Sequence, residues 1–153
     1  MLRLRPYNKN DADIILSWSK DKISFYKWSA GVMGKYPISK EKFGLVENLV
    51  AFTAIDNDEI IGFFTIRRPS DSFDELRFGF VVVDPAKRGK GYGKAMLQLG
   101  LKFAKEIYVL KRFLKVFLKI TNLLITVIKL LDLKILFWKR LKPIPFLAKN
   151  GNA

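Results

Sequence analysis

The sequence predicts an α+β domain with a mixed, mainly antiparallel sheet that is flanked by helices. Three observations indicate this class. Apolar runs with the pattern of β-strands and amphipathic helical runs both occur along residues 1–108. Their order is strand, helices, antiparallel strands, loop and helix, which is typical of α+β proteins and not of helix bundles. No internal period is present, so a repeat protein is excluded.

Length and composition narrow the possible functions. The chain has 153 residues, half of them hydrophobic, enough for one domain with its own core. It contains no cysteine and no histidine, which excludes a disulfide scaffold, a zinc site built on these residues, a cysteine nucleophile and a histidine-based triad. We expect no metal, and a cysteine-free chain fits a cytoplasmic protein. The net charge of +14 suggests acidic partners such as phosphates, nucleic acid or an anionic membrane surface.

No segment predicts export or a membrane span. Residues 1–13 lack the apolar stretch of a signal peptide. The longest uncharged apolar run of the C-terminal third, Ile120 to Ile128, is too short for a bilayer, which needs about 20 residues.

The first elements can be read from alternation and capping residues. Residues 2–5 alternate apolar and charged side chains, as a half-buried strand does, and Pro6 ends this strand. Asn10 is expected to cap a helix that has acidic residues in its first turn. Three apolar residues of this helix are expected to share one face: Ile14, Ile15 and Trp18.

The middle of the chain predicts one more helix and a hairpin. A short helix is expected over residues 21–28, and residues 39–42 resemble another helix start. Residues 49–55 and 60–66 have the composition of strands, and the polar residues 56–58 between them predict a tight turn.

A third long strand is expected over residues 76–83, and Asp84-Pro85 ends it. After a glycine-rich basic loop, residues 95–108 predict a helix. Its apolar residues are Met96, Leu97, Leu99, Leu101, Phe103 and Ala104.

The loop between this strand and this helix is the most informative feature. Glycines at positions 89, 91 and 93 allow backbone N–H groups to converge without obstruction by Cβ atoms. Together with the helix N-terminus they predict an anion site that suits a pyrophosphate, and Arg88, Lys90 and Lys94 add positive charge. The alternative is a plain strand-to-helix turn with solvated lysines. The loop lacks the Gly-Lys-Ser/Thr ending of a Walker loop and the βαβ context of a dinucleotide fold.

The run Arg88-Gly89-Lys90-Gly91-Tyr92-Gly93 resembles the Arg/Gln-x-x-Gly-x-Gly/Ala loop of the GCN5-related N-acetyltransferases (GNAT). The preceding strands, the Asp-Pro and the N-terminal Leu-Arg-Leu-Arg-Pro also sit where that family has them, over about residues 2–108. The resemblance implies a GNAT-like fold with acetyl-CoA as co-substrate. It implies that loop amides bind the pyrophosphate and that the preceding strand pairs with the pantetheine arm. The implied binding residues are Val81, Val83, Arg88, Gly89, Lys90, Gly91, Tyr92, Gly93 and Lys94.

The resemblance also implies direct transfer of the acetyl group to a primary amine of a small molecule or a protein N-terminus. A carboxylate then removes the amine proton, and Glu75 is the nearest candidate. The alternative for Glu75 is a solvated turn acid beside Asp74. Four early aromatic residues either line the acceptor pocket or belong to the core: Trp18, Phe25, Tyr26 and Trp28.

Residues 109–153 do not fit the family. They carry 10 Lys and Arg but a single acid, Asp132, and have almost no turn residues. The family continues with a strand, a helix that carries an Asn, and a Tyr that protonates the leaving thiolate. If the coding DNA is translated one base earlier than the given frame, the codons of residues 116–121 permit the sequence V-F-E-N-N and those of residues 126–134 permit C-Y-K-A-A-G-F-K. Both strings resemble the segments that the family has here. We therefore divide the chain into a GNAT-like acetyl-CoA-binding core, 1–108, and an atypical, out-of-frame basic apolar tail, 109–153.

Two function hypotheses follow from this division. The first is an N-acetyltransferase, for which the tail as given predicts weak cofactor binding and little or no turnover. The second is a non-catalytic basic protein whose tail binds a membrane surface or nucleic acid. The apolar residues of the tail occur almost all round a helix, which argues against a clean interfacial helix. We expect no specific nucleic acid, and at most a weak association of the tail with anionic membranes.

Overall fold

The computed structural model describes residues 1–43, 49–67 and 76–108. In this part of the chain four strands form one sheet in the order β1-β2-β3-β4, and each neighbouring pair is antiparallel. The strands are β1 (Arg3–Pro6), β2 (Leu49–Asp56), β3 (Glu59–Arg67) and β4 (Arg77–Val83). The helices are α1 (Ala12–Ser17), α2 (Lys22–Ser29) and α3 (Tyr92–Tyr108), with short 3-10 helices η1 (Lys9–Asp11) and η2 (Pro85–Lys87).

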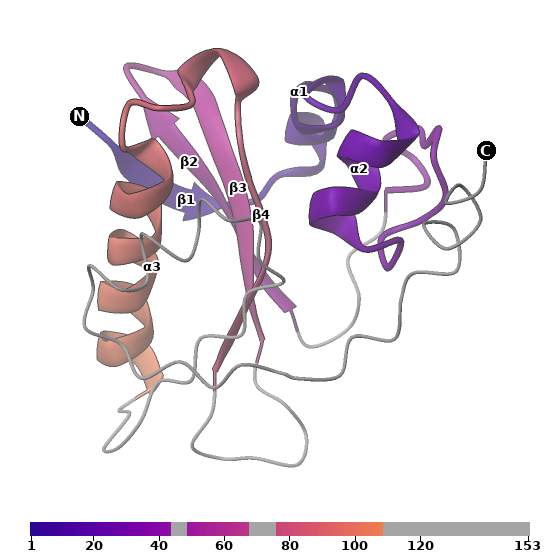
Figure 1. Ribbon diagram of the computed structural model, residues 1–153. Coiled ribbons are helices and arrows are strands. Elements are labelled where there is room, and N and C mark those ends of the chain that lie inside the picture. Colours follow the sequence, from indigo (N-terminus) through magenta and orange to yellow (C-terminus); the bar gives the residue numbers. More distant parts are fainter. Residues whose placement is uncertain (44–48, 68–75, 109–153) are drawn as a thin grey trace, which may run out of the picture.

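The helices cover the two faces of the sheet. Helix α3 lies on one face, and α1 and α2 lie on the other, as Figure 1 shows. The expected α+β fold with a mainly antiparallel sheet is therefore confirmed. No helix within the described ranges is long and apolar enough to cross a membrane.

The hairpin between β2 and β3 forms because two polar residues accept a left-handed backbone. Asn57 and Asp58 have φ angles of 47° and 64°, and Asp56 pairs with Glu59 across the turn. Asn and Asp adopt this conformation more readily than other non-glycine residues, and two such residues match the twist of the flanking strands. This confirms the tight turn expected at residues 56–58.

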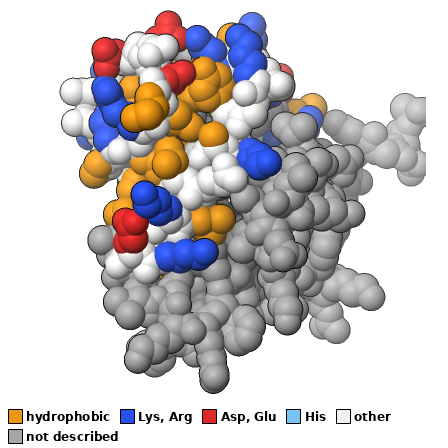
Figure 2. Space-filling model, turned by 90° about the vertical axis from the view of Figure 1, so that its left-hand side faces the viewer, with side chains coloured by type: hydrophobic (Ala, Val, Ile, Leu, Met, Phe, Trp, Pro, Cys, Tyr) orange, Lys and Arg blue, Asp and Glu red, His pale blue; other side chains and the backbone are white. Residues whose placement is uncertain are grey.

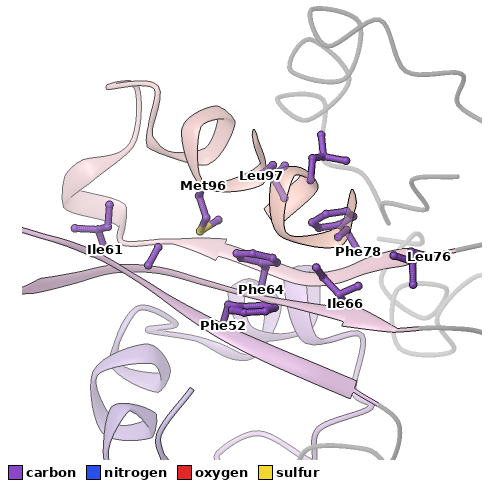
Figure 3. Packing of buried hydrophobic residues seen from close by; sticks show 11 residues of the cluster. Phe52, Ile61, Phe64, Ile66, Leu76, Phe78, Met96 and Leu97 are labelled. Atoms are coloured by element: carbon purple, nitrogen blue, oxygen red, sulfur yellow. The ribbon is translucent and has the colours of Figure 1, made fainter. Parts of the chain in front are cut away.

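The core beneath α3 is built from stacked phenylalanine rings. The ring centroids of Phe52 and Phe64 lie 5.3 Å apart, and those of Phe64 and Phe78 lie 5.7 Å apart. Met96 and Leu97 of α3 pack over these rings (Figure 3). A second cluster on the opposite face joins residues of α1 to the sheet, among them Ala12, Ile15, Trp18, Phe63 and Val82.

Three expectations about the helical segments before β2 are wrong in detail. Asn8, not Asn10, is the capping residue, and its Oδ1 accepts from the Asn10 N–H at 2.9 Å. Ile14 is 45% exposed, whereas Ile15 and Trp18 are buried, because α1 spans only six residues and buries a narrow face. Residues 40–42 form a single turn, closed by N–H groups of Lys42 and Phe43 on the Ser39 carbonyl, and one turn is too short to propagate a helix.

Helix α3 begins at Tyr92, three residues before the expected start at Ala95.

The early aromatic residues divide between core and partial exposure. Trp18 and Phe25 are buried, which confirms the core alternative for both. Tyr26 and Trp28 are half-buried, and their ring centroids lie 5.4 and 5.6 Å from that of Phe25.

A buried carboxylate ties β1 to the first helices. Asp11 is 4% exposed, and both its oxygens accept from the Arg5 guanidinium at 2.7 Å. Its Oδ2 also accepts from the Thr53 hydroxyl at 2.8 Å and from the Asn8 N–H at 2.9 Å. Burial raises the pKa of Asp11, but the hydrogen bonds from Arg5, Asn8 and Thr53 and the charge of Arg5 bring its net pKa below the ordinary value.

Replacing Asp11 by asparagine is expected to lower the free energy of unfolding at pH 7 by about 2–3 kcal/mol. The pKa of Asp11 is lower in the folded state than in the unfolded state, where it is near the ordinary ~3.9. The stabilisation is therefore present above pH ~4 and is lost as the pH falls through the folded-state pKa.

Urea unfolding of both chains at pH 7 and at pH 3 checks this. The difference should shrink at the lower pH, because pH 3 lies below the unfolded-state pKa, where the stabilisation that comes from the lowered folded-state pKa is being lost. Asp13→Asn, at an exposed carboxylate that pairs with Lys40, serves as the control. An equal loss for Asp11→Asn at both pH values would show that the charge of this carboxylate does not stabilise the fold.

Candidate functional site

The strand-to-helix loop extends from β4 to α3 at the end of the sheet where the β2–β3 hairpin also lies (Figure 1). Asp84 starts the loop: its N–H donates to the Ile61 carbonyl, and its Oδ1 accepts from the Ala86 N–H, both at 2.9 Å. The short helix η2 follows, with Pro85 at its first position, where the missing N–H is not needed. Asp84-Pro85 thus ends the strand, as expected.

Two of the three glycines are required by their backbone conformation. Gly89 and Gly91 have φ angles of 77° and 82°, in the left-handed region that side chains rarely adopt. A Cβ built at either position would meet no described atom within 4 Å. Gly93 has no such constraint, and a Cβ there would lie 3.7 Å from the Val83 side chain. The open side of the loop therefore exposes backbone rather than side chains.

The charge around this loop is positive. Arg88 and Lys90 are exposed, and Lys94 is half-buried in the first turn of α3. The N–H groups of that turn lack carbonyl partners four residues earlier within the helix, and they form its positive end. Figure 2, which views the molecule from the side of α3, shows Lys and Arg side chains on the described part of this face, with some Asp and Glu side chains among them. This arrangement can bind a polyanion.

A β-bulge interrupts β4 beside the loop. Phe63 pairs with Val82 and Thr65 pairs with Gly79, so Phe80 and Val81 together lie opposite the single residue Phe64. Phe80 has a φ of 51°, an unusual conformation for a bulky residue. A bulge leaves the extra residue out of the ladder and bends the strand. No local pattern in the sequence indicates the bulge, because the left-handed residue is a phenylalanine and not a glycine.

The side chains beside the bulge separate to the two faces of the sheet. Phe80 packs against the cluster of α1, whereas Val81 and Val83 pack against the cluster beneath α3. The bulge therefore contacts the cluster of the early helices on one face and the cluster beneath α3 on the other, and its backbone is on the last strand of the described sheet.

Two contacts of the loop were not predicted from the sequence. The Tyr92 hydroxyl donates to Asp56 Oδ2 at 2.8 Å, and Lys87 Nζ lies 2.5 Å from Glu59 Oε2. The Met1 ammonium lies 2.9 Å from Asp56 Oδ1. Hydrogen bonds from Met1 and Tyr92 hold the pKa of Asp56 below its ordinary value, and the same carboxylate raises the pKa of Tyr92. These contacts join residues far apart in the sequence, so no local pattern indicates them.

The structure brings the expected cofactor-binding residues together along one continuous segment. They are Val81 and Val83 at the end of β4, Arg88 to Gly91 in the loop, and Tyr92, Gly93 and Lys94 in the first turn of α3. The Arg88 side chain turns back to the strand, and its Nε donates to the Val83 carbonyl at 3.2 Å. The expected base Glu75 lies outside the described residues.

Comparisons with known proteins point to one family. Residues 16–122 match the model of the acetyltransferase (GNAT) family. This match extends beyond residue 108 into the expected tail, which lies outside the described residues, so the boundary at 108/109 stays a prediction. No curated protein sequence matches the chain.

Solved structures share the fold. One is a predicted acetyltransferase with acetyl-CoA from Clostridium acetobutylicum, which is 21% identical, with a TM-score of 0.59 over 93% of this chain and 95% of the other. A glucosamine-6-phosphate N-acetyltransferase from Arabidopsis thaliana is 13% identical, with a TM-score of 0.61 over 93% and 97%. Spermidine N-acetyltransferase from Vibrio cholerae, in complex with CoA and spermine, is 16% identical, with a TM-score of 0.58 over 76% and 69%. Because the family model matches more than half of the chain, and the fold agrees with it, the chain belongs to the acetyltransferase (GNAT) family.

Proposed function

We propose that this chain binds the pyrophosphate of acetyl-CoA with residues 88–94. As a member of its family, the chain is an acetyl-CoA-dependent N-acetyltransferase. One observation carries the proposal: two left-handed glycines connect a strand to a helix N-terminus, and a Cβ at either would have no described atom within 4 Å. Phosphate oxygens need several converging N–H groups and positive charge, and this backbone supplies the first. Lys90, Lys94 and Arg88 supply the second.

The residues present fit the other parts of the ligand. Val81 and Val83 lie on the last strand of the described sheet, where an extended pantetheine arm can pair with the backbone as an added strand does. The bulge at Phe80 and Val81 frees backbone groups from the ladder with β3. We assign one of these N–H groups to the thioester carbonyl, where a fixed donor stabilises the charge that develops during transfer. The strained φ of Phe80 supports a functional role for this position.

Glu75 is proposed as the base that removes the proton from the attacking amine, directly or through a water. It precedes Leu76 and β4 in the sequence, and β4 leads to the loop. Replacing Glu75 by glutamine should lower the rate of coenzyme A release from acetyl-CoA and an amine by about a hundredfold, with unchanged acetyl-CoA affinity.

An assay of thiol release checks this prediction. Unchanged turnover in Glu75→Gln would refute the role of this carboxylate. A wild-type chain that binds acetyl-CoA but transfers nothing would instead agree with the loss of activity predicted from residues 109–153. Sequencing the coding DNA around codon 109 tests the reading-frame prediction independently of both.

The acceptor is proposed to be a primary amine of a small molecule or a protein N-terminus. The similar structures from Vibrio cholerae and Arabidopsis thaliana are named for spermidine and for glucosamine-6-phosphate, so small amines are the first acceptors to assay. A cytoplasmic location stays a prediction. The alternative of a non-catalytic membrane or nucleic-acid binding protein depends on residues 109–153, outside the described residues, and the family match favours the enzyme.

A further inference from the structure

The tip of the β2–β3 hairpin contacts both ends of the glycine loop. Lys87, the last residue of η2, forms an ion pair with Glu59, the first residue of β3. Tyr92, the first residue of α3, donates a hydrogen bond to Asp56, the last residue of β2. The segment 88–91 is therefore bounded on each side by a contact to the same hairpin.

The two hairpin carboxylates are well placed to act as fixed anchors. Asp56 and Glu59 are paired across the turn, so their side chains leave the same face of the sheet. The turn between them has only two residues, and the strands that it joins are paired from Leu49–Arg67 to Asp56–Glu59, with one register shift between Ala54 and Ile55. Two neighbouring carboxylates repel each other unless donors or cations are present. Lys87 pairs with Glu59, whereas Asp56 accepts from the Tyr92 hydroxyl and also pairs with the Met1 ammonium.

The loop itself has little packing that could fix its conformation. Residues 88–91 are all exposed, and no described atom lies within 4 Å of a Cβ at Gly89 or Gly91. Glycine backbones lose more conformational entropy on ordering than any others. If the loop became ordered only when a ligand bound, that entropy would reduce the affinity. Contacts at its two ends reduce this loss by holding the loop in place beforehand.

We propose that Asp56 and Glu59 are positioning residues, which hold segment 88–91 in its phosphate-binding conformation through Tyr92 and Lys87. This inference rests on the proposed function of the loop. It also changes the role of Tyr92, which the sequence suggested as a direct ligand contact. Its hydroxyl is bonded to Asp56, so this group acts on the ligand through the backbone that it anchors.

Calorimetric titration of the full chain with coenzyme A tests the proposal. Tyr92→Phe and Asp56→Ala are each expected to raise the Kd about tenfold, the size of one hydrogen bond to a charged group. The double variant should be little weaker than the single variants, because both changes remove the same contact. Asp56→Asn keeps an acceptor for Tyr92 and should recover much of the affinity.

Two matched controls separate positioning from a general loss of structure. Tyr36→Phe removes a hydroxyl that donates to the Lys20 carbonyl. Asp58→Asn removes the charge of an exposed carboxylate of the same turn that pairs with Arg3, and asparagine still accepts the left-handed backbone at this position. Neither should change the Kd. Amide hydrogen exchange without ligand provides the second measurement: Tyr92→Phe and Asp56→Ala should speed exchange at residues 89–92, and Tyr36→Phe should not.

The outcomes are distinguishable from a failure of the proposed function. If the wild type, Tyr92→Phe and Asp56→Ala all bind coenzyme A equally well, the positioning role of Asp56 and Glu59 is overturned, whether or not amide exchange is faster. The proposed function of the loop then still stands. If the wild type does not bind coenzyme A, the proposed function falls and this inference falls with it. Additive losses in the double variant would also overturn it, since the two residues would then act separately.

Discussion

Replacing Gly91 by valine is expected to reduce the affinity for acetyl-CoA by about a hundredfold or more, because two effects combine. The φ of 82° is unfavourable for a β-branched residue, so the loop would leave its present conformation. Any conformation that kept this φ would place a side chain on the open side of the loop, where the phosphates are proposed to bind. Calorimetric titration of both chains measures the loss.

Gly93→Ala is the matched control for this variant. Gly93 has no left-handed φ, it lies in the first turn of α3, and its Cβ would make an ordinary contact with Val83 at 3.7 Å. Because alanine keeps the backbone N–H that this position offers to the phosphates, we expect the affinity for acetyl-CoA to change by less than about threefold. Thermal unfolding without ligand shows whether each variant is folded. A folded Gly91→Val chain with wild-type affinity would mean that the loop does not bind the pyrophosphate.

Replacing Phe64 by alanine is expected to lower the free energy of unfolding by about 3–5 kcal/mol. Phe64 is fully buried, and its ring stacks between those of Phe52 and Phe78 beneath α3 (Figure 3). Gly100 of α3 approaches this ring so closely that a Cβ there would lie 2.8 Å from it, so α3 and the sheet interlock at this point. The cavity left by the ring can only partly collapse.

Urea unfolding measures this change, with Val50→Ala in β2 as a control. Val50 is 38% exposed, and its replacement should cost less than about 1 kcal/mol. Because α3 provides one end of the glycine loop, we expect the Phe64 variant to lose acetyl-CoA binding in the same range of urea in which it unfolds. If Phe64→Ala lowered the free energy of unfolding by no more than Val50→Ala does, the Phe64 ring would contribute little to the packing of α3 on the sheet.

The sequence predicted the parts of this fold that are determined locally. The strands follow from runs of β-branched and aromatic residues, and the hairpin follows from the polar turn at residues 56–58. The loop followed from its glycines, two of which, Gly89 and Gly91, have a positive φ. Local patterns were less reliable where neighbouring residues compete. Asn8 and Asn10 are both able to cap a helix, and only Asn8 has the extended backbone of a capping residue.

The features that the sequence did not predict depend on tertiary structure. The bulge at Phe80 arises from the register between β3 and β4, and a phenylalanine gives no sign of a left-handed backbone. The Tyr92–Asp56 hydrogen bond joins residues 36 positions apart and forms only when the hairpin meets the start of α3. In both cases the residue types carry no local signal, and the proposed roles depend on the positions of these residues in the folded chain.

Amide hydrogen exchange of the full chain with and without acetyl-CoA tests the central claim most directly. Bound acetyl-CoA should slow exchange at residues 89–94, where the loop and the first turn of α3 supply N–H groups, and at the β4 bulge beside them. The 3-10 turn of residues 9–11, on the opposite face of the sheet, should exchange at the same rate in both samples. Unchanged exchange at residues 89–94 under saturating acetyl-CoA, or protection only elsewhere, would contradict the assignment of this loop as the pyrophosphate site.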